Sequence, residues 1–219
     1  MCFNQKYSFL FTILGLLSYK ISNGKNHSHK IIIFYTIMEL LQTIQYIHVN
    51  KCNKINSFLT EIAYILVIVQ PLMWNYIFLQ RQKNTYYKGI LYCAVILCGV
   101  WIIGNLLRRS KSYSKNNFNN EIMQGTKNCT YRKKDEHLYW NLKFYNNPGF
   151  DANWFMYFIL WIVPGMIVPG NHLGIFGILV GMIGSYFYLS YKRQTFHIFP
   201  SLWCLTSVPT IFLSLLLEN

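Results

Sequence analysis

Long apolar runs separated by short polar segments dominate this chain of 219 residues. A helix of about twenty apolar residues crosses the hydrocarbon core of a bilayer, and the usual range is about 17 to 25. Most runs approach or reach that length and are apolar on every face, unlike the alternating segments of a membrane β-barrel. The seven runs are residues 7–22, 30–49, 57–79, 86–107, 154–168, 172–191 and 199–217.

This pattern predicts an all-α fold, a polytopic transmembrane helix bundle of about seven spans that forms a single domain over residues 1–219. Residues 108–153 are polar and are predicted to form a long loop between the fourth and fifth helices. Within that loop, residues 137–145 alternate enough to form a short hairpin or an interfacial segment. The first run has a weak basic start and no small-residue cleavage site, so we interpret it as a retained helix rather than a signal peptide.

The composition supports a membrane protein. Hydrophobic residues make up 53% of the chain and charged residues 12%, against about 25% charged residues in an average soluble domain. In a soluble protein the net charge of +13 would suggest a nucleic-acid partner. Here Lys and Arg lie almost entirely between the runs, where they flank lipid headgroups. We therefore expect a lipid bilayer as the partner and no nucleic acid, and self-association stays open.

Seven spans would place four cysteines on or near the same face as the N-terminus. They are Cys2, Cys52, Cys129 and Cys204. Their segregation suggests an oxidising compartment and at least one disulfide, with Cys129 bonded to one of the other three. Asn128 begins an N-glycosylation sequon on that face. Chance placement of the cysteines is the alternative.

Basic residues give conflicting evidence on orientation. Nine of the 20 Lys and Arg lie in 108–153, which favours a cytoplasmic long loop, whereas six others favour a cytoplasmic opposite face. Those six are Lys20, Lys25, Lys30, Arg81, Lys83 and Lys88. Because basic residues follow the first helix more often than they precede it, we predict an outside or lumenal N-terminus.

Glu39 is the most informative single residue, because it lies near the middle of the run 30–49. A carboxylate at that depth is costly and usually faces protein or water. Gln42 lies on the same helical stripe. No Lys or Arg lies deep in any run, so we expect Glu39 to be protonated or hydrogen bonded to amides. It serves either as a proton or cation site or as a polar contact between helices.

The run 57–79 carries further polar residues. Glu61 is close to the expected interface, where a solvated carboxylate is the simpler interpretation. Asn75 is deeper and could reach the stripe that holds Glu39, whereas Gln70 lies on the opposite side of its helix. Glu61 and Asn75 therefore join Glu39 and Gln42 as candidate ion or proton residues.

Glycines recur along the sixth run at alternating steps of four and three residues. Small residues let helix backbones approach closely, so these glycines predict a packing seam, with a ligand groove as the alternative. The seam consists of Gly170, Gly174, Gly177, Gly181 and Gly184.

Motifs for enzymatic chemistry are absent from the chain. The histidines are scattered, and neither a zinc-protease helix, a nucleophile elbow nor a phosphate-binding loop occurs. We therefore expect no catalytic residue, no metal and no cofactor.

Several strings resemble an uncharacterised family of small polytopic membrane proteins encoded by giant DNA viruses. They include M-E-L-L-Q from Met38, Q-P-L-M-W-N from Gln70, S-L-W-C from Ser201, and Cys129 with His137 in the long loop. The family usually begins Met-Cys-Trp, and Phe3 departs from this conservatively. The resemblance covers most of the chain and implies a seven-helix body in a viral or host membrane, but it supplies no activity.

Three function classes follow. The leading hypothesis is a multi-pass viral or host-membrane component without enzymatic chemistry. A channel or transporter-like protein with a proton or cation site at Glu39 is the first alternative. An intramembrane enzyme or a receptor-like seven-helix module is the other, and it rests on fold analogy.

Overall fold

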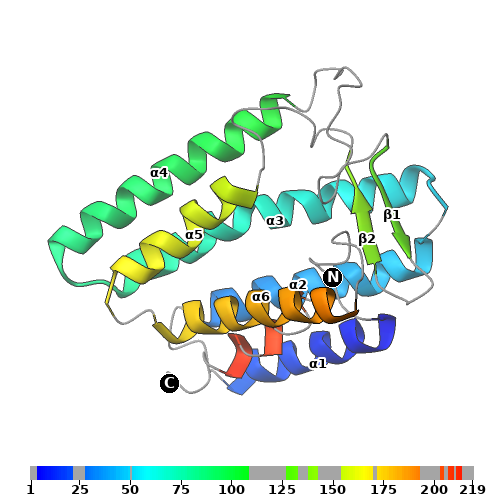
Figure 1. The fold of residues 1–219 in the computed structure, drawn as a ribbon, viewed down its shortest axis with the longest axis horizontal. Helices are drawn as coiled ribbons and strands as arrows, with labels where there is room; N and C mark the ends of the chain where they lie inside the picture. The colour runs from blue at the N-terminus through cyan, green and yellow to red at the C-terminus, as the bar shows by residue number, and fades with distance from the viewer. Residues whose placement is uncertain are drawn as a thin grey trace.

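A computed structural model of the chain describes eight elements of secondary structure in a mostly helical molecule (Figure 1). The described residues are 4–21, 28–49, 51–108, 127–132, 138–142, 154–169 and 172–192, with short pieces at 203–204, 207–209 and 211–213. The elements are α1 (Gln5–Ile21), α2 (Ser28–His48), α3 (Lys54–Arg81), α4 (Thr85–Arg108), β1 (Cys129–Arg132), β2 (Leu138–Asn141), α5 (Trp154–Ile167) and α6 (His172–Lys192). Of the predicted helix 199–217, only the short pieces are described, and they are helical.

Asparagine side chains cap three of the helices at their N-termini. Asn4 Oδ1 accepts from the backbone N–H of Tyr7, 3.1 Å away, at the start of α1. Asn84 does the same for Tyr86 at the start of α4, at 2.9 Å. Asn53 caps α3. Each cap satisfies an N–H that has no partner within the helix, so the polar residues before the apolar runs set the helix starts.

α3 occupies the middle of the molecule and packs against α2, α4 and α5 (Figure 1). α1 packs against α2, and α6 packs against α5. Trp74 of α3 lies at the centre of this packing and is fully buried. Its ring contacts those of Phe78 and Trp161, with centroids 5.5 and 6.0 Å away, and its indole N–H donates to the Tyr35 hydroxyl at 3.0 Å.

Within the described residues, four helices are long and apolar enough to cross a membrane. They correspond to α2, α3, α4 and α6. α1 has 17 residues and α5 has 14. At about 1.5 Å per residue, α5 is shorter than a hydrocarbon core of about 30 Å. Seven spans were predicted, which is more than the four helices of the described residues that are long and apolar enough to cross a membrane.

A two-stranded antiparallel sheet makes the fold mostly helical rather than all-α. β1 and β2 pair with Thr130 opposite Trp140 and Cys129 opposite Asn141. β2 lies within the residues 137–145 whose alternation indicated a hairpin, whereas β1 was not predicted. The strands lie at the end of the bundle where α3 begins (Figure 1).

The glycine seam on α6 is only partly a packing surface. Gly177 and Gly181 are buried, whereas Gly184 is exposed and nothing lies within 4 Å of where its side chain would begin. The buried face at this end of α6 is marked by Ser185 and Leu189. Gly184 is rotated by about 100° from Ser185, which turns it away from the neighbouring elements. Gly170 lies outside the described residues, and no packing is described for Gly174.

α1 and α2 approach each other closely at Gly15. A methyl group added there would collide with Thr36 Oγ1 and would lie 3.0 Å from Thr36 Cβ and 3.1 Å from a ring carbon of Phe212. The Thr36 hydroxyl donates to the Ile32 carbonyl at 2.7 Å, so it cannot rotate away without losing that bond. Gly15 therefore permits the close packing of α1 on α2.

Gly15→Ala should lower the free energy of unfolding in detergent by about 1–3 kcal/mol, because the added methyl group overpacks this contact. Gly99→Ala on α4 is the matched control, since nothing lies within 4 Å of its added methyl group. The control should gain about 0.5–1 kcal/mol from the lower entropy of the unfolded chain. Thermal unfolding followed by tryptophan fluorescence compares the two, and a gain in both would show that α1 does not pack on Thr36.

Candidate functional site

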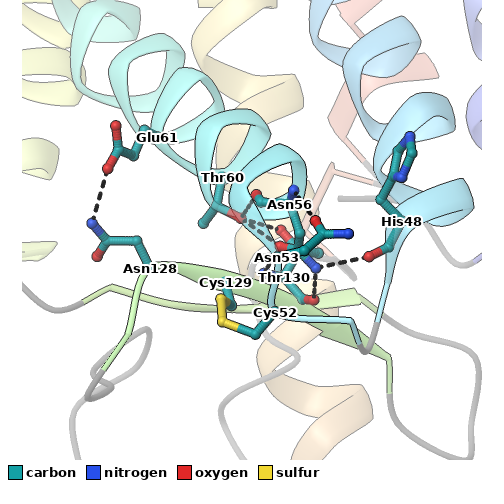
Figure 2. Close-up of a disulfide and its surroundings, with 9 residues drawn as sticks. All are labelled: His48, Cys52, Asn53, Asn56, Thr60, Glu61, Asn128, Cys129 and Thr130. Atoms are coloured by element: carbon teal, nitrogen blue, oxygen red, sulfur yellow. Dashed lines mark hydrogen bonds between the residues drawn. A yellow bond between two sulfur atoms is a disulfide. The ribbon is translucent and has the colours of Figure 1, made fainter.

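Asn56, in the first turn of α3, holds the hairpin to the helical body (Figure 2). Its carboxamide pairs with both backbone groups of Thr130: Oδ1 accepts from the Thr130 N–H at 2.7 Å, and Nδ2 donates to the Thr130 carbonyl at 2.9 Å. Nδ2 also donates to the carbonyl of His48 at 2.9 Å. The side-chain amide thus makes the two backbone hydrogen bonds to Thr130 that a neighbouring strand would make. It links the end of α2, the start of α3 and β1.

The Thr130 side chain lies in a chain of buried hydrogen bonds. Gln45 Nε2 donates to Thr130 Oγ1 at 3.0 Å. The Thr60 hydroxyl donates to the backbone carbonyl of Asn56 at 2.7 Å. The Thr130 hydroxyl therefore donates to Thr60 Oγ1, also at 2.7 Å. All four side chains are at most 1% exposed. Buried polar groups of this kind are costly to leave without partners, so the network specifies one position for β1.

A disulfide joins Cys52 to Cys129 next to this network (Figure 2). It connects the segment before α3 with β1, 77 residues later, with the two Cα atoms 5.6 Å apart. Cys52 is one of the partners that the sequence left open for Cys129. Cys204 is a free thiol in the structure, which overturns its candidate pairing with Cys129. Cys2 lies outside the described residues.

Beside the disulfide, Asn128 Nδ2 donates to Glu61 Oε1 at 3.2 Å (Figure 2). Both side chains are partly buried. Glu61 therefore belongs to the surface of α3 on which the hairpin packs, here called the docking surface. The two residues lie beside a hollow of about 690 Å³ that is also lined by Lys54 and Lys127.

A tyrosine pair stacks across the two strands. The rings of Tyr131 and Tyr139 are 5.4 Å apart and inclined by 22°. Burial raises the pKa of the Tyr139 hydroxyl, and the nearby Tyr131 raises it further. The Tyr139 hydroxyl therefore remains neutral near pH 7, and the stacked rings make a cross-strand contact.

Glu39 and Gln42 are buried together on α2, at 0% and 1% exposed. They lie three residues apart and so share a helix face. The backbone carbonyl of Glu39 accepts from the Thr43 hydroxyl at 3.0 Å. These two of the four candidate residues are therefore adjacent in the helical body, whereas Glu61 lies at the hairpin.

Asn75, which the sequence allowed to reach the stripe of Glu39, donates to α5. Its Nδ2 donates to the carbonyl of Leu160 at 2.6 Å and to the carbonyl of Pro71 at 2.8 Å. The Leu160 carbonyl has no helical donor, because Pro164 lacks an N–H. Asn75 supplies that donor and thereby holds α5 to α3, which is a structural role.

Gln70 faces α2, on a different side of α3 from Asn75, as predicted. Its Nε2 donates to Met38 Sδ at 3.0 Å, and its Oε1 accepts from the Tyr157 hydroxyl. Gln70 and Tyr157 border a cavity of about 20 Å³, close to the size of one water molecule. Glu39 is not among the residues that line this cavity.

Three residues of the contact between α3 and the hairpin were missed by the sequence reasoning, namely Asn56, Thr60 and Thr130. Each is a common polar residue near an expected helix end or in a loop, where solvent exposure is the usual outcome. The available signal was Cys129, since a disulfide from Cys52 places Thr130 beside the start of α3. Among the described residues, no group of three His, Cys, Asp or Glu side chains could hold a metal ion.

Comparison with known proteins places the chain in a family. Residues 6–218 match the sequence profile of a family of unknown function, DUF5765, and the chain belongs to that family. An uncharacterized protein of Acanthamoeba polyphaga mimivirus is 25% identical over 229 residues, covering 95% of this chain and 91% of that protein. No solved structure matches the chain. Kinship with uncharacterised proteins of giant DNA viruses is thus confirmed.

Proposed function

We propose that this member of a family of unknown function is a multi-pass integral membrane protein, a component of a virion or host membrane without enzymatic chemistry of its own. The observation that carries the proposal is the apolar outside of the helical body. Large apolar side chains are exposed along most of its helices, and the polar side chains that are buried lie among an apolar core. A soluble protein covers much more of its outside with polar and charged side chains.

α4 shows the apolar outside most clearly. Ile96 is 63% exposed and Leu107 is 68% exposed. Further exposed apolar residues on α4 are Tyr92, Leu97, Val100, Ile103 and Leu106. A soluble monomer rarely exposes so continuous an apolar face, whereas the hydrocarbon of a bilayer would cover it.

Buried polar side chains join the helices in the interior. Tyr64 donates to Asn105 Oδ1 at 3.1 Å between α3 and α4, and Asn105 Nδ2 donates to the carbonyl of Trp101 at 2.8 Å. Asn75 joins α3 to α5 in the same way. Polar side chains that hydrogen-bond between helices are the usual contacts in membrane bundles, where lipid cannot satisfy them.

The disulfide supports an outside or lumenal position for the hairpin. Disulfides persist in oxidising compartments, and Cys52 is exposed at the end of the bundle. The opposite end carries Lys20, Lys30, Arg81, Lys83 and Lys88 without a carboxylate near them in sequence, which suits the cytoplasmic side.

Labelling in sealed vesicles tests this topology. Lys83→Cys and Lys127→Cys place thiols at opposite ends, at exposed positions. An impermeant maleimide should label one before permeabilisation and the other only afterwards, and the protein should resist extraction at alkaline pH. The parent chain corrects for native thiols such as Cys93. Labelling of both positions from one side, or release at alkaline pH, would refute the proposal.

A proton or cation site at Glu39 is the second candidate, favoured by a carboxyl group that is 0% exposed beside Gln42. A charged carboxylate at the centre of a membrane helix costs roughly 2.5–3.5 kcal/mol. Protonating an ordinary glutamate at pH 7 costs about 3.7 kcal/mol, at about 1.36 kcal/mol per pH unit. The two costs are comparable, so binding of a cation or a proton could control the charge.

Glu39→Gln distinguishes the two candidates in liposomes. If Glu39 is a transport site, the parent should show cation or proton flux and Glu39→Gln should abolish it while keeping the thermal stability. If Glu39 is a contact between helices, the parent should show no flux above empty liposomes. Glu61→Gln is the control, because Glu61 lies at the hairpin and should not affect flux.

A further inference from the structure

Residues 128–130 read Asn-Cys-Thr, an acceptor sequence for N-glycosylation. All three residues are engaged in the docked hairpin. Asn128 donates to Glu61, Cys129 is disulfide bonded, and Thr130 is hydrogen bonded through its hydroxyl, N–H and carbonyl. The sequon therefore lies against the docking surface.

Docking hides the part of the sequon that a glycosyltransferase must bind. An Asn-x-Thr acceptor is recognised through its Thr as well as its Asn, which requires a chain segment that can leave the protein surface. Thr130 is 1% exposed, and so is Cys129. The Asn56 amide occupies both backbone groups of Thr130. In the docked state the enzyme would have to break this buried network before it could bind the acceptor.

We infer that Asn128 is an N-glycan acceptor only before the hairpin docks, so that glycan transfer competes with formation of the Cys52–Cys129 disulfide. In the transfer, Asn128 Nδ2 bonds to the anomeric carbon of a lipid-linked oligosaccharide. The bond from that carbon to the diphosphate oxygen breaks, the lipid diphosphate leaves with the electron pair, and the amide loses one proton. This inference rests on the proposed lumenal position of the hairpin.

The competing reaction is thiol–disulfide exchange. The Cys52 and Cys129 thiols transfer two electrons and two protons to the disulfide of an oxidising protein of the compartment, which becomes a dithiol. The product holds β1 against the start of α3, where Asn56 and Thr60 then bind Thr130. Slower formation of the disulfide leaves the sequon accessible for longer. The glycosylated fraction therefore reports how fast the hairpin docks.

Expression in a eukaryotic secretory system, followed by glycosidase digestion and gel electrophoresis, measures the glycosylated fraction. The parent should be glycosylated in a minor fraction of molecules. Cys52→Ser should raise that fraction several-fold, because the hairpin is no longer locked. Asn56→Ala should raise it too, because it removes the noncovalent contact with Thr130. Asn128→Gln should remove the glycan from every variant.

Two controls separate undocking from other losses of structure. Cys93→Ser removes an exposed free thiol on α4 and should leave the glycosylated fraction unchanged. Gly15→Ala strains the contact of α1 with Thr36 and should leave it unchanged as well. Equal increases in these variants would show that general instability, not hairpin docking, controls glycosylation, and the inference would fail.

A topology reporter separates failure of this inference from failure of the proposed function. Glu121→Thr combined with Asn128→Gln creates a sequon at Asn119, between α4 and β1 in sequence. An unglycosylated reporter would overturn the lumenal orientation and the inference with it. A glycosylated reporter with complete glycosylation of the disulfide-bonded parent would overturn the competition alone. So would a glycosylated reporter with no glycan on Cys52→Ser.

Discussion

Cys52→Ala should lower the free energy of unfolding in detergent by about 4 kcal/mol. The disulfide closes a loop of 77 residues, and removing a cross-link over such a length restores that much chain entropy to the unfolded state. The hairpin lies at one end of the bundle, far in sequence from the start of α3. The disulfide therefore fixes a contact between two segments that are distant in the sequence. Equilibrium unfolding with guanidinium, followed by tryptophan fluorescence, measures the loss.

Cys93→Ala is the matched control for this prediction. Cys93 is exposed and free on α4, so its replacement should change the free energy by less than about 0.5 kcal/mol. A loss below about 1 kcal/mol in Cys52→Ala would mean that noncovalent contacts alone constrain the hairpin. The reduced parent should unfold as Cys52→Ala does, which tests the bond rather than the side chain.

Asn56→Ala should lower the melting temperature in detergent by roughly 6–12 °C. The substitution leaves the N–H and carbonyl of Thr130 and the carbonyl of His48 without their partner. Each buried polar group left in this way costs about 1–3 kcal/mol, so we expect a total of about 3 kcal/mol, and about 2–4 °C per kcal/mol for a chain of this size.

Asn53→Ala is the control for the same residue type three positions earlier. The Asn53 side chain accepts only the cap bond from the Asn56 N–H, at 2.9 Å, and it is exposed. Loss of an N-cap costs about 1 kcal/mol, hence roughly 2–4 °C. Equal losses in both variants would show that Asn56 acts through the helix start and not through the hairpin.

Cys52 and Asn56 both attach the hairpin to the helical body. Asn56 and Thr60 lie on the first two turns of α3, and Gln45 lies near the end of α2. The side chains that bind the hairpin therefore belong to helices that also form the bundle. Displacement of the hairpin would leave buried amides and hydroxyls without partners at the ends of α2 and α3, which ties the two parts together.

The sequence alone predicted the helical body. A long apolar run offers the backbone no polar side-chain partners, and a helix satisfies the backbone hydrogen bonds within the run itself. The bounds of α4, Thr85–Arg108, differ by one residue at each end from the run 86–107. The burial of Glu39 was also predicted from the sequence, since a carboxyl group within a long apolar run usually faces protein or water. The bounds of α5, Trp154–Ile167, likewise differ by one residue from the run 154–168, and Pro164 lies inside the helix.

Only the tertiary structure decided which polar residues meet. Asn75 turns to α5 because the Leu160 carbonyl lacks a donor there, and Gln70 turns to α2 instead. A helical-wheel argument orders residues around one helix but does not say which neighbour each face meets. Likewise, Thr130 and Asn56 are 74 residues apart. Their pairing depends on how the long connection returns to the start of α3, which no local pattern encodes.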